Sequence, residues 1–371
     1  MNIKMLFIIN DNEKKLIKFV NKFHLPFNTI MHGYGTASKG ILNFFNLVPT
    51  EKNSDFTHDL SEYTDKVRQL IEASVAPETR RAYSSRLKRF FTWCEVKGLS
   101  ATFPISPDTL AAYIVDMTND NLKYSTIEQT LAAISTAHKA QGLTSPTESL
   151  LIKKIVKGFK REYGTAKRKH DAATVDVVRY LLNSIPDDSS PKHIRDRAII
   201  SLGFAGAFRR SELCALNVEN LKWTFKNAQE ILLIEIQRSK TDQEGQGMTK
   251  AIFPSNDRTV SPLELLKKWL IISNFRQRAL FTRILKGGQI TSERLTPQSV
   301  RLIVKKSAMS AGLSLDLSAH SLRSGFVTTA IRQGKSERSI MNQTGHKSTQ
   351  VLREYFIRED AVEDNAALNI I

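Results

Sequence analysis

The order of apolar and polar positions divides the chain into three regions. In the first, residues 3–9 are apolar enough for a short buried strand, residues 13–23 follow the spacing of an amphipathic helix, and residues 27–32 indicate a second strand. A Gly-rich turn and a helical pattern from about Ala37 to Phe45 follow. The pattern predicts a small unit of alternating strands and helices before about residue 53.

From about Thr57 the apolar positions recur with helical spacing, and no segment alternates as a half-buried strand does. The spacing predicts a helix over residues 60–74 and another from Pro77 to about Lys97, ended by Gly98. Helix-start sequences mark three more helices, at Ser106, Tyr124 and Ser145. We therefore expect residues 57–163 to form a compact helical domain.

Residues 164–172 are polar and basic and separate this region from the next. They include Lys167, Arg168 and Lys169, a composition that suits both a linker crossing a DNA backbone and a plain connector. The predicted second domain covers residues 173–371. Its pattern indicates helices at 174–184 and 191–206, strands at 231–237 and 249–253, and further helices to the end.

The chain is strongly basic, with 54 Lys and Arg against 37 Asp and Glu, a net charge of +17 and a pI near 9.8. This charge favours a polyanionic partner and predicts salt-dependent binding, but by itself it leaves DNA, RNA and an anionic membrane open. Arg81, Lys88 and Arg89 share one face of a predicted helix. Such a face contacts phosphate groups in many DNA-binding proteins, and it is also common as a solvated surface.

Cys94 and Cys214 are the two cysteines, and each lies inside an apolar helical pattern, which predicts buried free thiols in a reducing compartment. The apolar residues 5–9 are too few to cross a membrane, and no basic leader precedes them. We therefore expect a cytoplasmic protein without a membrane partner.

Six residues of the second domain have the chemistry that phosphodiester transfer needs: in chain order, Arg209, Lys240, His320, Arg323, His346 and Tyr355. Arginine presents a charged fork to the oxygens of a phosphate, and histidine exchanges protons near neutral pH. A phenol can attack phosphorus if its proton is removed. Glu212, three residues after Arg209, faces the same side of a helix and could orient it.

Several of these residues also have a purely structural interpretation. Arg209 with Glu212 could be an exposed helical pair, Tyr355 a core tyrosine among apolar neighbours, and Lys240 a lysine on a surface hairpin. Their order and local contexts decide between the interpretations. These contexts are Phe-Arg-Arg-Ser-Glu-Leu, Arg-Ser-Lys-Thr-Asp, His-Ser-Leu-Arg, Gly-His-Lys-Ser-Thr and Arg-Glu-Tyr-Phe.

In this order the contexts resemble those of the tyrosine recombinase (phage integrase) family, over roughly residues 60–360. The chain departs mildly from the family pattern at Ala207, Phe208 and Ser324, where glycine, leucine and histidine are usual. The resemblance implies a mainly α fold: a SAM-like helical core-binding domain, and a mixed α/β catalytic domain with a small antiparallel sheet.

The resemblance also implies a mechanism without cofactor or metal. Tyr355 would attack a scissile phosphate, form a 3′-phosphotyrosine and release a 5′-hydroxyl. Arg209 and Arg323 would hold the phosphate, and His320 would accept a proton or donate to the phosphate. His346 would donate to the phosphate, and Lys240 would be the general acid, with Lys250 as a weaker rival. The implied partners are double-stranded DNA at specific sites, three further protomers in a tetramer on a Holliday junction, and accessory DNA-bending factors.

Other functions stay open from the sequence. A type IB topoisomerase would use the same chemistry, and an architectural protein would keep the charge without the cleavage. The stretch from Met31 to Gly40 resembles part of a PII-like nitrogen regulator, so residues 1–53 are interpreted as a partial βαβα appendage of that kind. A regulatory sensor is therefore the third alternative.

Overall fold

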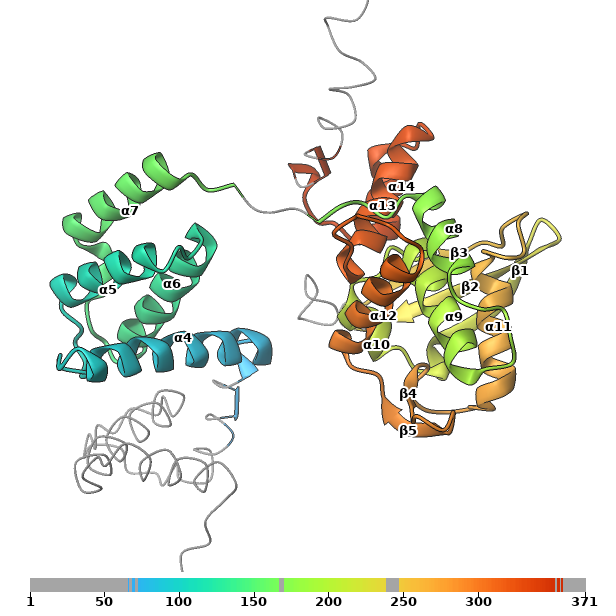
Figure 1. Cartoon of the computed structure of the whole chain (residues 1–371), viewed down its shortest axis with the longest axis horizontal. Coiled ribbons are helices and arrows are strands. Elements are labelled where there is room, and N and C mark those ends of the chain that lie inside the picture. Colours follow the sequence, from blue (N-terminus) through green and yellow to red (C-terminus); the bar gives the residue numbers. More distant parts are fainter. Residues whose placement is uncertain are drawn as a thin grey trace, which may run out of the picture. The chain divides into compact units, whose positions relative to one another are not determined.

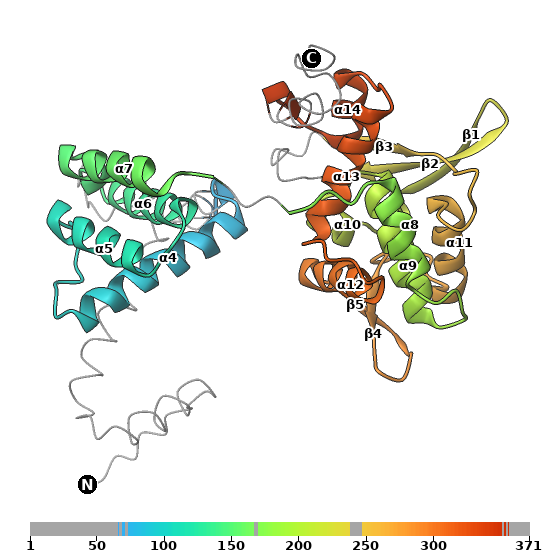
Figure 2. The same cartoon turned by 45° about the horizontal axis from the view of Figure 1, so that its top comes forward.

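The computed structural model describes residues 66, 69–70, 73–166, 170–237, 247–350, 352–353 and 355. The chain divides into two compact units, Met1–Lys167 and Arg168–Ile371, which are described separately (Figures 1 and 2). The predicted strands and helices of residues 1–53, and most of the helix predicted at 60–74, lie outside the described residues. So do Lys167, Arg168 and Lys169.

The first unit is helical, as predicted, and its described residues contain no strand. Its elements are α4 (Pro77–Val96), α5 (Pro107–Asn119), α6 (Tyr124–Ala140), the 3₁₀ turn η1 (Pro146–Glu148) and α7 (Leu150–Tyr163). The helix predicted to begin at Ser145 is divided in two. Ser145 caps only the short turn, and the hydroxyl of Ser149 then accepts from the backbone N–H of Ile152 at 3.3 Å and starts α7.

Helix α4 shows why this unit folds around its aromatic residues. Leu87, Phe90, Phe91 and Cys94 recur at helical spacing and are all buried. Phe90 packs edge-on against Tyr113 of α5, with ring centroids 5.2 Å apart. Burial of one such side chain stabilises the fold by about 1.5–3 kcal/mol. The Cys94 thiol is free, as predicted, and burial raises its pKa to about 11.

The second unit combines helices with two small antiparallel sheets. Its helices are α8 (Val175–Asn183), α9 (Pro191–Ala205), α10 (Arg210–Ala215), α11 (Pro262–Ser273), α12 (Pro297–Ser310), α13 (Ala319–Arg332) and α14 (Glu337–Thr344), with the 3₁₀ turn η2 (Val218–Asn220). One sheet has the order β1 (Leu221–Lys226), β2 (Gln229–Ile236), β3 (Met248–Ile252), and the other pairs β4 (Thr282–Ile284) with β5 (Ile290–Arg294). No helix of the described ranges is long and apolar enough to cross a membrane.

The fold class inferred from the sequence is confirmed, and the predicted helices α8 and α9 and strands β2 and β3 are present within two residues of their predicted bounds. Strands β1, β4 and β5 were not predicted. Strand β1 shows no clean alternation of buried and exposed positions, and Phe225 on it is 72% exposed. Strand β4 has only three residues, too few for a period of two to be recognised.

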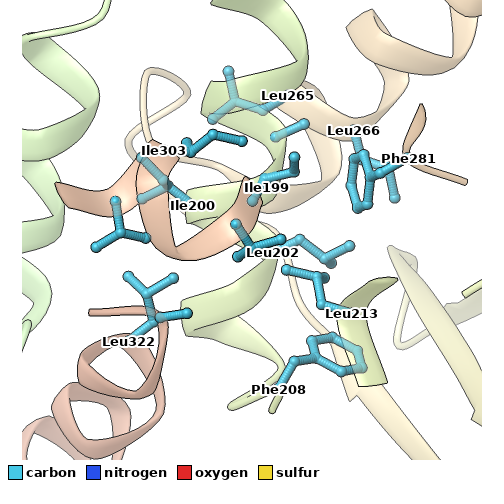
Figure 3. Packing of buried hydrophobic residues seen from close by; sticks show 14 of the residues in the cluster. Ile199, Ile200, Leu202, Phe208, Leu213, Leu265, Leu266, Phe281, Ile303 and Leu322 are labelled. Carbon is cyan, nitrogen blue, oxygen red and sulfur yellow. The ribbon is translucent and has the colours of Figure 1, made fainter. Parts of the chain in front are cut away.

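Helix α9 forms the centre of the second unit and packs against α8, α11 and α13, which lie near it in Figure 1. Figure 3 shows Ile199, Ile200 and Leu202 of this helix packed among apolar side chains of several other elements. Two of its buried charges form a pair: the Arg195 guanidinium donates to Asp196 at 2.6 Å and also to the Thr282 carbonyl at 3.0 Å. The core thus holds the end of α9, where Arg209 follows, in a fixed position.

The segment before α8 packs directly on α13. The Ala173 N–H donates to the Ser321 carbonyl at 2.9 Å, and the Asp171 N–H donates to the Asp316 carbonyl at 3.2 Å. A Cβ at Gly325 would lie 1.8 Å from the Ala173 carbonyl oxygen, so only glycine allows this approach. Contacts of the second unit therefore reach back into the predicted linker of residues 164–172, whose bounds stay a prediction.

Gly325→Ala is expected to lower the free energy of unfolding of the second unit by about 3 kcal/mol, at the upper end of overpacking costs. The added methyl group forces the Ala173 backbone away from α13 and breaks its bond to Ser321. Urea unfolding monitored by tryptophan fluorescence would measure the change. Gly287→Ala is the control, because a Cβ there has nothing within 4 Å. Equal stabilities of the two variants would contradict the close packing.

Candidate functional site

Arg209 lies at the start of α10, directly after a tight turn that ends α9. Ala207 in this turn has a φ of 45°, and the neighbouring Phe208 side chain is buried in the core (Figure 3). The Arg209 guanidinium donates to Glu212 at 2.6 Å, and its backbone N–H donates to the other carboxylate oxygen at 2.9 Å. Glu212 is only 3% exposed. The pair is therefore not a solvated surface pair, and it holds the guanidinium in one orientation.

Arg323 is a buried cation on α13. The preceding residue, Leu322, packs in the core (Figure 3). One terminal nitrogen of Arg323, Nη1, donates to the Ala207 carbonyl at 2.8 Å. The other, Nη2, is buried and has no hydrogen-bond partner among the described residues. Burial and the nearby Arg209 lower the pKa of Arg323 to about 10. A buried donor without a partner is costly, so this nitrogen is suited to an anionic ligand.

His320 and Arg323 lie three residues apart on α13, as predicted, but their surroundings differ. His320 is exposed in the first turn of the helix, which Ser318 caps. Its backbone N–H donates to the Ser318 hydroxyl at 3.3 Å. The imidazole of His320 therefore lies at the surface, one helical turn before the buried guanidinium, where it can exchange protons with solvent or substrate.

His346 follows α14 and Gly345, which has the left-handed φ of 71°. Its Nδ1 is 3.1 Å from the Thr344 hydroxyl oxygen, and that hydroxyl donates its own proton to the Ile340 carbonyl at 2.8 Å. The ring proton therefore resides on Nδ1, which leaves a lone pair on Nε2. Burial is the main cause that lowers the pKa of His346 to about 4, followed by the charges of Arg323 and Arg209. This histidine is neutral at pH 7.

Acidification is expected to destabilise the second unit through His346. The unfolded imidazole has a pKa near 6.5, so between about pH 6.5 and pH 4 the unfolded chain binds a proton that the folded chain does not. The free energy of unfolding therefore falls as the pH is lowered through this window, by on the order of 2–3 kcal/mol. Urea unfolding at several pH values would show a smaller loss for His346→Gln. The same loss in both proteins would rule out this histidine as its source.

Tyr355 is half-buried and packs against an apolar cluster formed by Val327, Ala330, Ile340 and Leu352. Its phenol also lies close enough to Arg323 to raise the pKa of the guanidinium. The tyrosine is therefore not a closed core residue. The packing holds the ring, and its oxygen is within electrostatic range of the cation that would bind a phosphate.

Two lysines complete the comparison with the predicted site. Lys240 lies outside the described residues. Lys250, considered only as its rival, is 0% exposed on β3 and lies close enough to His346 to lower its pKa. A signal for this burial existed in the sequence: Met248, Lys250 and Ile252 occupy the same face of one strand, so the lysine is flanked by apolar residues at a period of two.

The predicted DNA-contact residues belong to the first unit. Arg81, Lys88 and Arg89 are exposed on α4, opposite its buried aromatic face. Arg81 also pairs with Glu78 at 3.0 Å, an exposed helical pair of little energetic weight. Exposure suits phosphate contact but also a solvated surface, so the DNA contacts of these residues stay a prediction.

A cavity of about 450 Å³ lies elsewhere in the second unit. It is lined by residues of α9, β4, α12 and the segment after α8, such as Ile185, Lys192 and Ile303, and by none of the predicted catalytic residues.

Comparison with known proteins gives this cluster a context. The model of the phage integrase family matches residues 172–361, and the model of the N-terminal SAM-like domain of phage integrases matches residues 61–140. An integrase/recombinase described as a XerD homolog, from Selenomonas ruminantium, is 34% identical over 305 residues, or 81% of this chain and 87% of the relative. The Cre recombinase of Escherichia phage P1 is 23% identical over 289 residues, or 72% of this chain and 80% of the relative.

Solved structures share the fold at lower identity. XerH recombinase, bound to a palindromic difH substrate after cleavage, has a TM-score of 0.61 and 18% identity, and the match covers 90% of this chain and 96% of XerH. A lambda integrase tetramer on a Holliday junction has a TM-score of 0.54 and 17% identity, covering 82% of this chain and 78% of that protein. At these sequence identities, the similarity to the solved structures shows a shared fold.

Proposed function

Because this chain belongs to the phage integrase family of tyrosine recombinases, we propose that Tyr355 is the nucleophile with which it cleaves and rejoins DNA strands at specific sites. The observation that carries the proposal is the buried Nη2 of Arg323, which has no partner among the described residues while Nη1 is held by Ala207. A phosphate oxygen supplies the missing acceptor, and the Tyr355 phenol lies within electrostatic range of the same guanidinium.

The cleavage step exchanges a phosphodiester bond of the DNA for a phosphotyrosine bond of similar energy. The Tyr355 oxygen attacks the phosphorus as its proton passes to a base, for which His320 is the candidate. The bond from phosphorus to the 5′-oxygen breaks, and that oxygen takes a proton from Lys240 and leaves as a hydroxyl. The 3′ end is then joined to the enzyme as a phosphotyrosine. Attack by a 5′-hydroxyl of the partner strand reverses the step, so neither ATP nor a cofactor is required.

The two arginines and His346 would stabilise the charge that develops on the non-bridging oxygens. Arg209, oriented by Glu212, and Arg323 present fixed donors that need no rearrangement during the reaction. His346 carries its proton on Nδ1, so it must take up a second proton before Nε2 can donate to the phosphate. Burial is the main cause that lowers the pKa of His346, and the charges of Arg323 and Arg209 add to it; a phosphate between the arginines would raise the pKa by offsetting these charges.

The partners follow from the same proposal. XerH and lambda integrase were solved on their DNA sites, the latter also as a tetramer on a Holliday junction. We expect this chain to bind double-stranded DNA at specific sites and to assemble in the same way. The exposed Arg81, Lys88 and Arg89 of α4, together with Lys167, Arg168 and Lys169, would contact phosphates. Accessory DNA-bending factors stay a prediction.

The residues before 61 are covered by neither family model, and their resemblance to part of a PII-like domain stays a proposal. Removal of residues 1–53 tests whether they act as a sensor. Loss of nucleotide binding on their removal would support that role, and unchanged strand cleavage would separate it from the catalytic function.

The test of the catalytic proposal is a covalent adduct. Sites bound by the purified full chain are first enriched from random duplex DNA, then rebuilt as suicide substrates with a nick beside each candidate cleavage position. A denaturant-stable protein–DNA adduct, with the nucleotide mapped by mass spectrometry to the peptide that contains Tyr355, is the expected result. An adduct on another residue, or none, would overturn the proposal. Relaxation of plasmids without an enriched site would instead indicate a topoisomerase.

A further inference from the structure

Lys250 is a buried lysine that the proposed reaction does not use. It is 0% exposed and lies in the middle of β3, where its backbone is opposite Ile234 of β2. Burial is the main cause that lowers its pKa to about 7; Glu212 opposes the shift, and Arg323 and Arg209 contribute to it. An ammonium group costs free energy in such a place unless strong acceptors surround it. The acceptors it contacts therefore indicate what it does.

Those acceptors are the carbonyls of Gly206, the C-cap of α9, and of Ala207, which follows it. The Lys250 Nζ donates to the Gly206 carbonyl at 2.6 Å and to the Ala207 carbonyl at 3.3 Å, and it lies 4.8 Å from the centre of the Phe208 ring. The final carbonyls of a helix have no partner within the helix and carry the negative end of its dipole. A cation at this point both satisfies these groups and complements their charge.

The same turn is bound by two other side chains of the second unit. Arg323 donates to the Ala207 carbonyl at 2.8 Å, so Lys250 and Arg323 share one acceptor. Gln343 of α14 donates to the Ala205 carbonyl at 3.0 Å and to the Ala251 carbonyl of β3 at 3.1 Å. Three consecutive carbonyls, from residues 205 to 207, are thus bound by side chains of β3, α13 and α14.

This turn leads directly into Arg209. Ala207 has a left-handed φ of 45°, a conformation that costs about 1 kcal/mol or more for a residue other than glycine and needs support from its surroundings. Lys250 provides that support by donating to the carbonyls of Gly206 and Ala207, and Arg323 donates to the Ala207 carbonyl as well. If the turn relaxed, Arg209 and the anchor of Arg323 would both move.

We propose that Lys250 is a positioning residue for strand cleavage: by clamping the Gly206–Ala207 turn, it holds the guanidinium groups of Arg209 and Arg323 at the separation that one phosphate requires. This inference rests on the proposed function and deepens it. Lys250 does not touch the reacting atoms in this role, which distinguishes it from the general acid. A displacement of about 1 Å among positioned groups is enough to lower a rate by on the order of 10²-fold.

The test compares Lys250→Met with the full-length wild type on an enriched site. The methionine keeps the length of the side chain and leaves the strand pairing intact. We expect adduct formation to slow by on the order of 10²-fold, while DNA affinity stays within about threefold, because phosphate contacts spread over the interface dominate binding. Lys222→Met on β1 is the matched control, since the Lys222 side chain is 61% exposed. We expect it to react at the wild-type rate.

Two further measurements separate positioning from other roles. On a substrate with sulfur in place of the 5′-bridging oxygen, the thiolate leaves without a proton, so a variant lacking the general acid recovers its rate. Lys250→Met should stay as slow there, and its recovery would overturn the proposal. In an Arg323→Ala background the loss caused by Lys250→Met should shrink to about threefold or less. A full, additive loss would also overturn the proposal.

Folding is monitored by thermal unfolding of each variant. If Lys250→Met does not fold, Lys250→Gln is used in its place: its amide still donates to one carbonyl, and an intermediate rate is expected. A Lys250 variant that folds and cleaves at the wild-type rate contradicts only the positioning role. Absence of any adduct with the wild-type chain contradicts the proposed function itself, so the two failures are distinct.

Discussion

Tyr355→Phe is expected to abolish the covalent protein–DNA adduct, with a loss of cleavage rate on the order of 10⁵-fold or more, as for the removal of other enzymatic nucleophiles. Phenylalanine keeps the ring that packs against Val327, Ala330, Ile340 and Leu352, so the fold should persist. Only the attacking oxygen is removed. Gel analysis of suicide substrates under denaturing conditions measures the adduct, and a mobility-shift assay measures binding.

Two comparisons make this result specific. Tyr180→Phe removes a phenol from the same unit, on α8, where the side chain is 61% exposed, and it should form adduct at the wild-type rate. Binding by Tyr355→Phe should be close to that of the wild type, because the phenol contributes little to phosphate contacts along the duplex. Persistent adduct in Tyr355→Phe would assign the nucleophile to another residue.

Arg323→Ala is expected to slow adduct formation by about 10²- to 10³-fold, the loss that follows removal of one fixed donor to a developing oxyanion. The change removes the guanidinium whose Nη2 has no partner among the described residues, and it deprives the Ala207 carbonyl of a donor. Since the charge of Arg323 lowers the pKa of His346, the variant should also titrate His346 at a higher pH than the wild type.

Single-turnover cleavage and NMR titration of His346 measure the two effects. Arg332→Ala provides the control, because Arg332 is an exposed arginine in the last turn of the same helix. It should change neither the rate nor the pKa of His346. If Arg323→Ala cleaved at the wild-type rate, the phosphate would have to bind elsewhere, and the proposed role of the Arg323 Nη2 would be contradicted.

The two substitutions with the largest expected effects, at Tyr355 and Arg323, change residues on different elements whose charges interact. Arg323 is on α13, Tyr355 follows α14, and Arg209 starts α10, and yet the charges of Arg209 and Tyr355 both act on the pKa of Arg323. The catalytic proposal depends on this convergence. The packing of α9, α13 and the segment around Ala173 maintains it, which is why Gly325 matters although it carries no chemistry.

Much of the fold could be predicted from periodicity. The helices from Pro77 to Ala140 and from Val175 to Ala205 follow apolar spacing and start sequences that act locally, so the chain determines them without tertiary help. Strands β1, β4 and β5 were missed because they are short or lack a clean alternation of buried and exposed positions, although β1 pairs with β2 and β4 with β5, its neighbour along the chain.

The catalytic candidates could be selected by motif and order, since the chemistry of a phosphoryl transfer restricts the residue types. The local contexts of Arg209, Arg323, His346 and Tyr355 carried that information. Neither motif nor composition indicated that Arg323 would be buried with one nitrogen that has no partner among the described residues, or that the ring proton of His346 would lie on Nδ1. The first depends on Ala207, 116 residues away, which only packing brings to Arg323; the second depends on Thr344, two residues before His346, and on the hydrogen bond that its hydroxyl donates to Ile340.

Lys250 illustrates the difference between what the sequence determines and what the tertiary structure decides. The sequence alone determined the residue types, the helical framework and the family, because those depend on side-chain chemistry and on spacing along the chain. The period of two around Lys250 indicated its burial, but only the tertiary structure decided that its side chain meets the turn after α9, where it shares the Ala207 carbonyl with Arg323. Such hydrogen-bond partners and the pKa shifts that follow from them arise from groups that lie far apart in the sequence and are brought together by the fold.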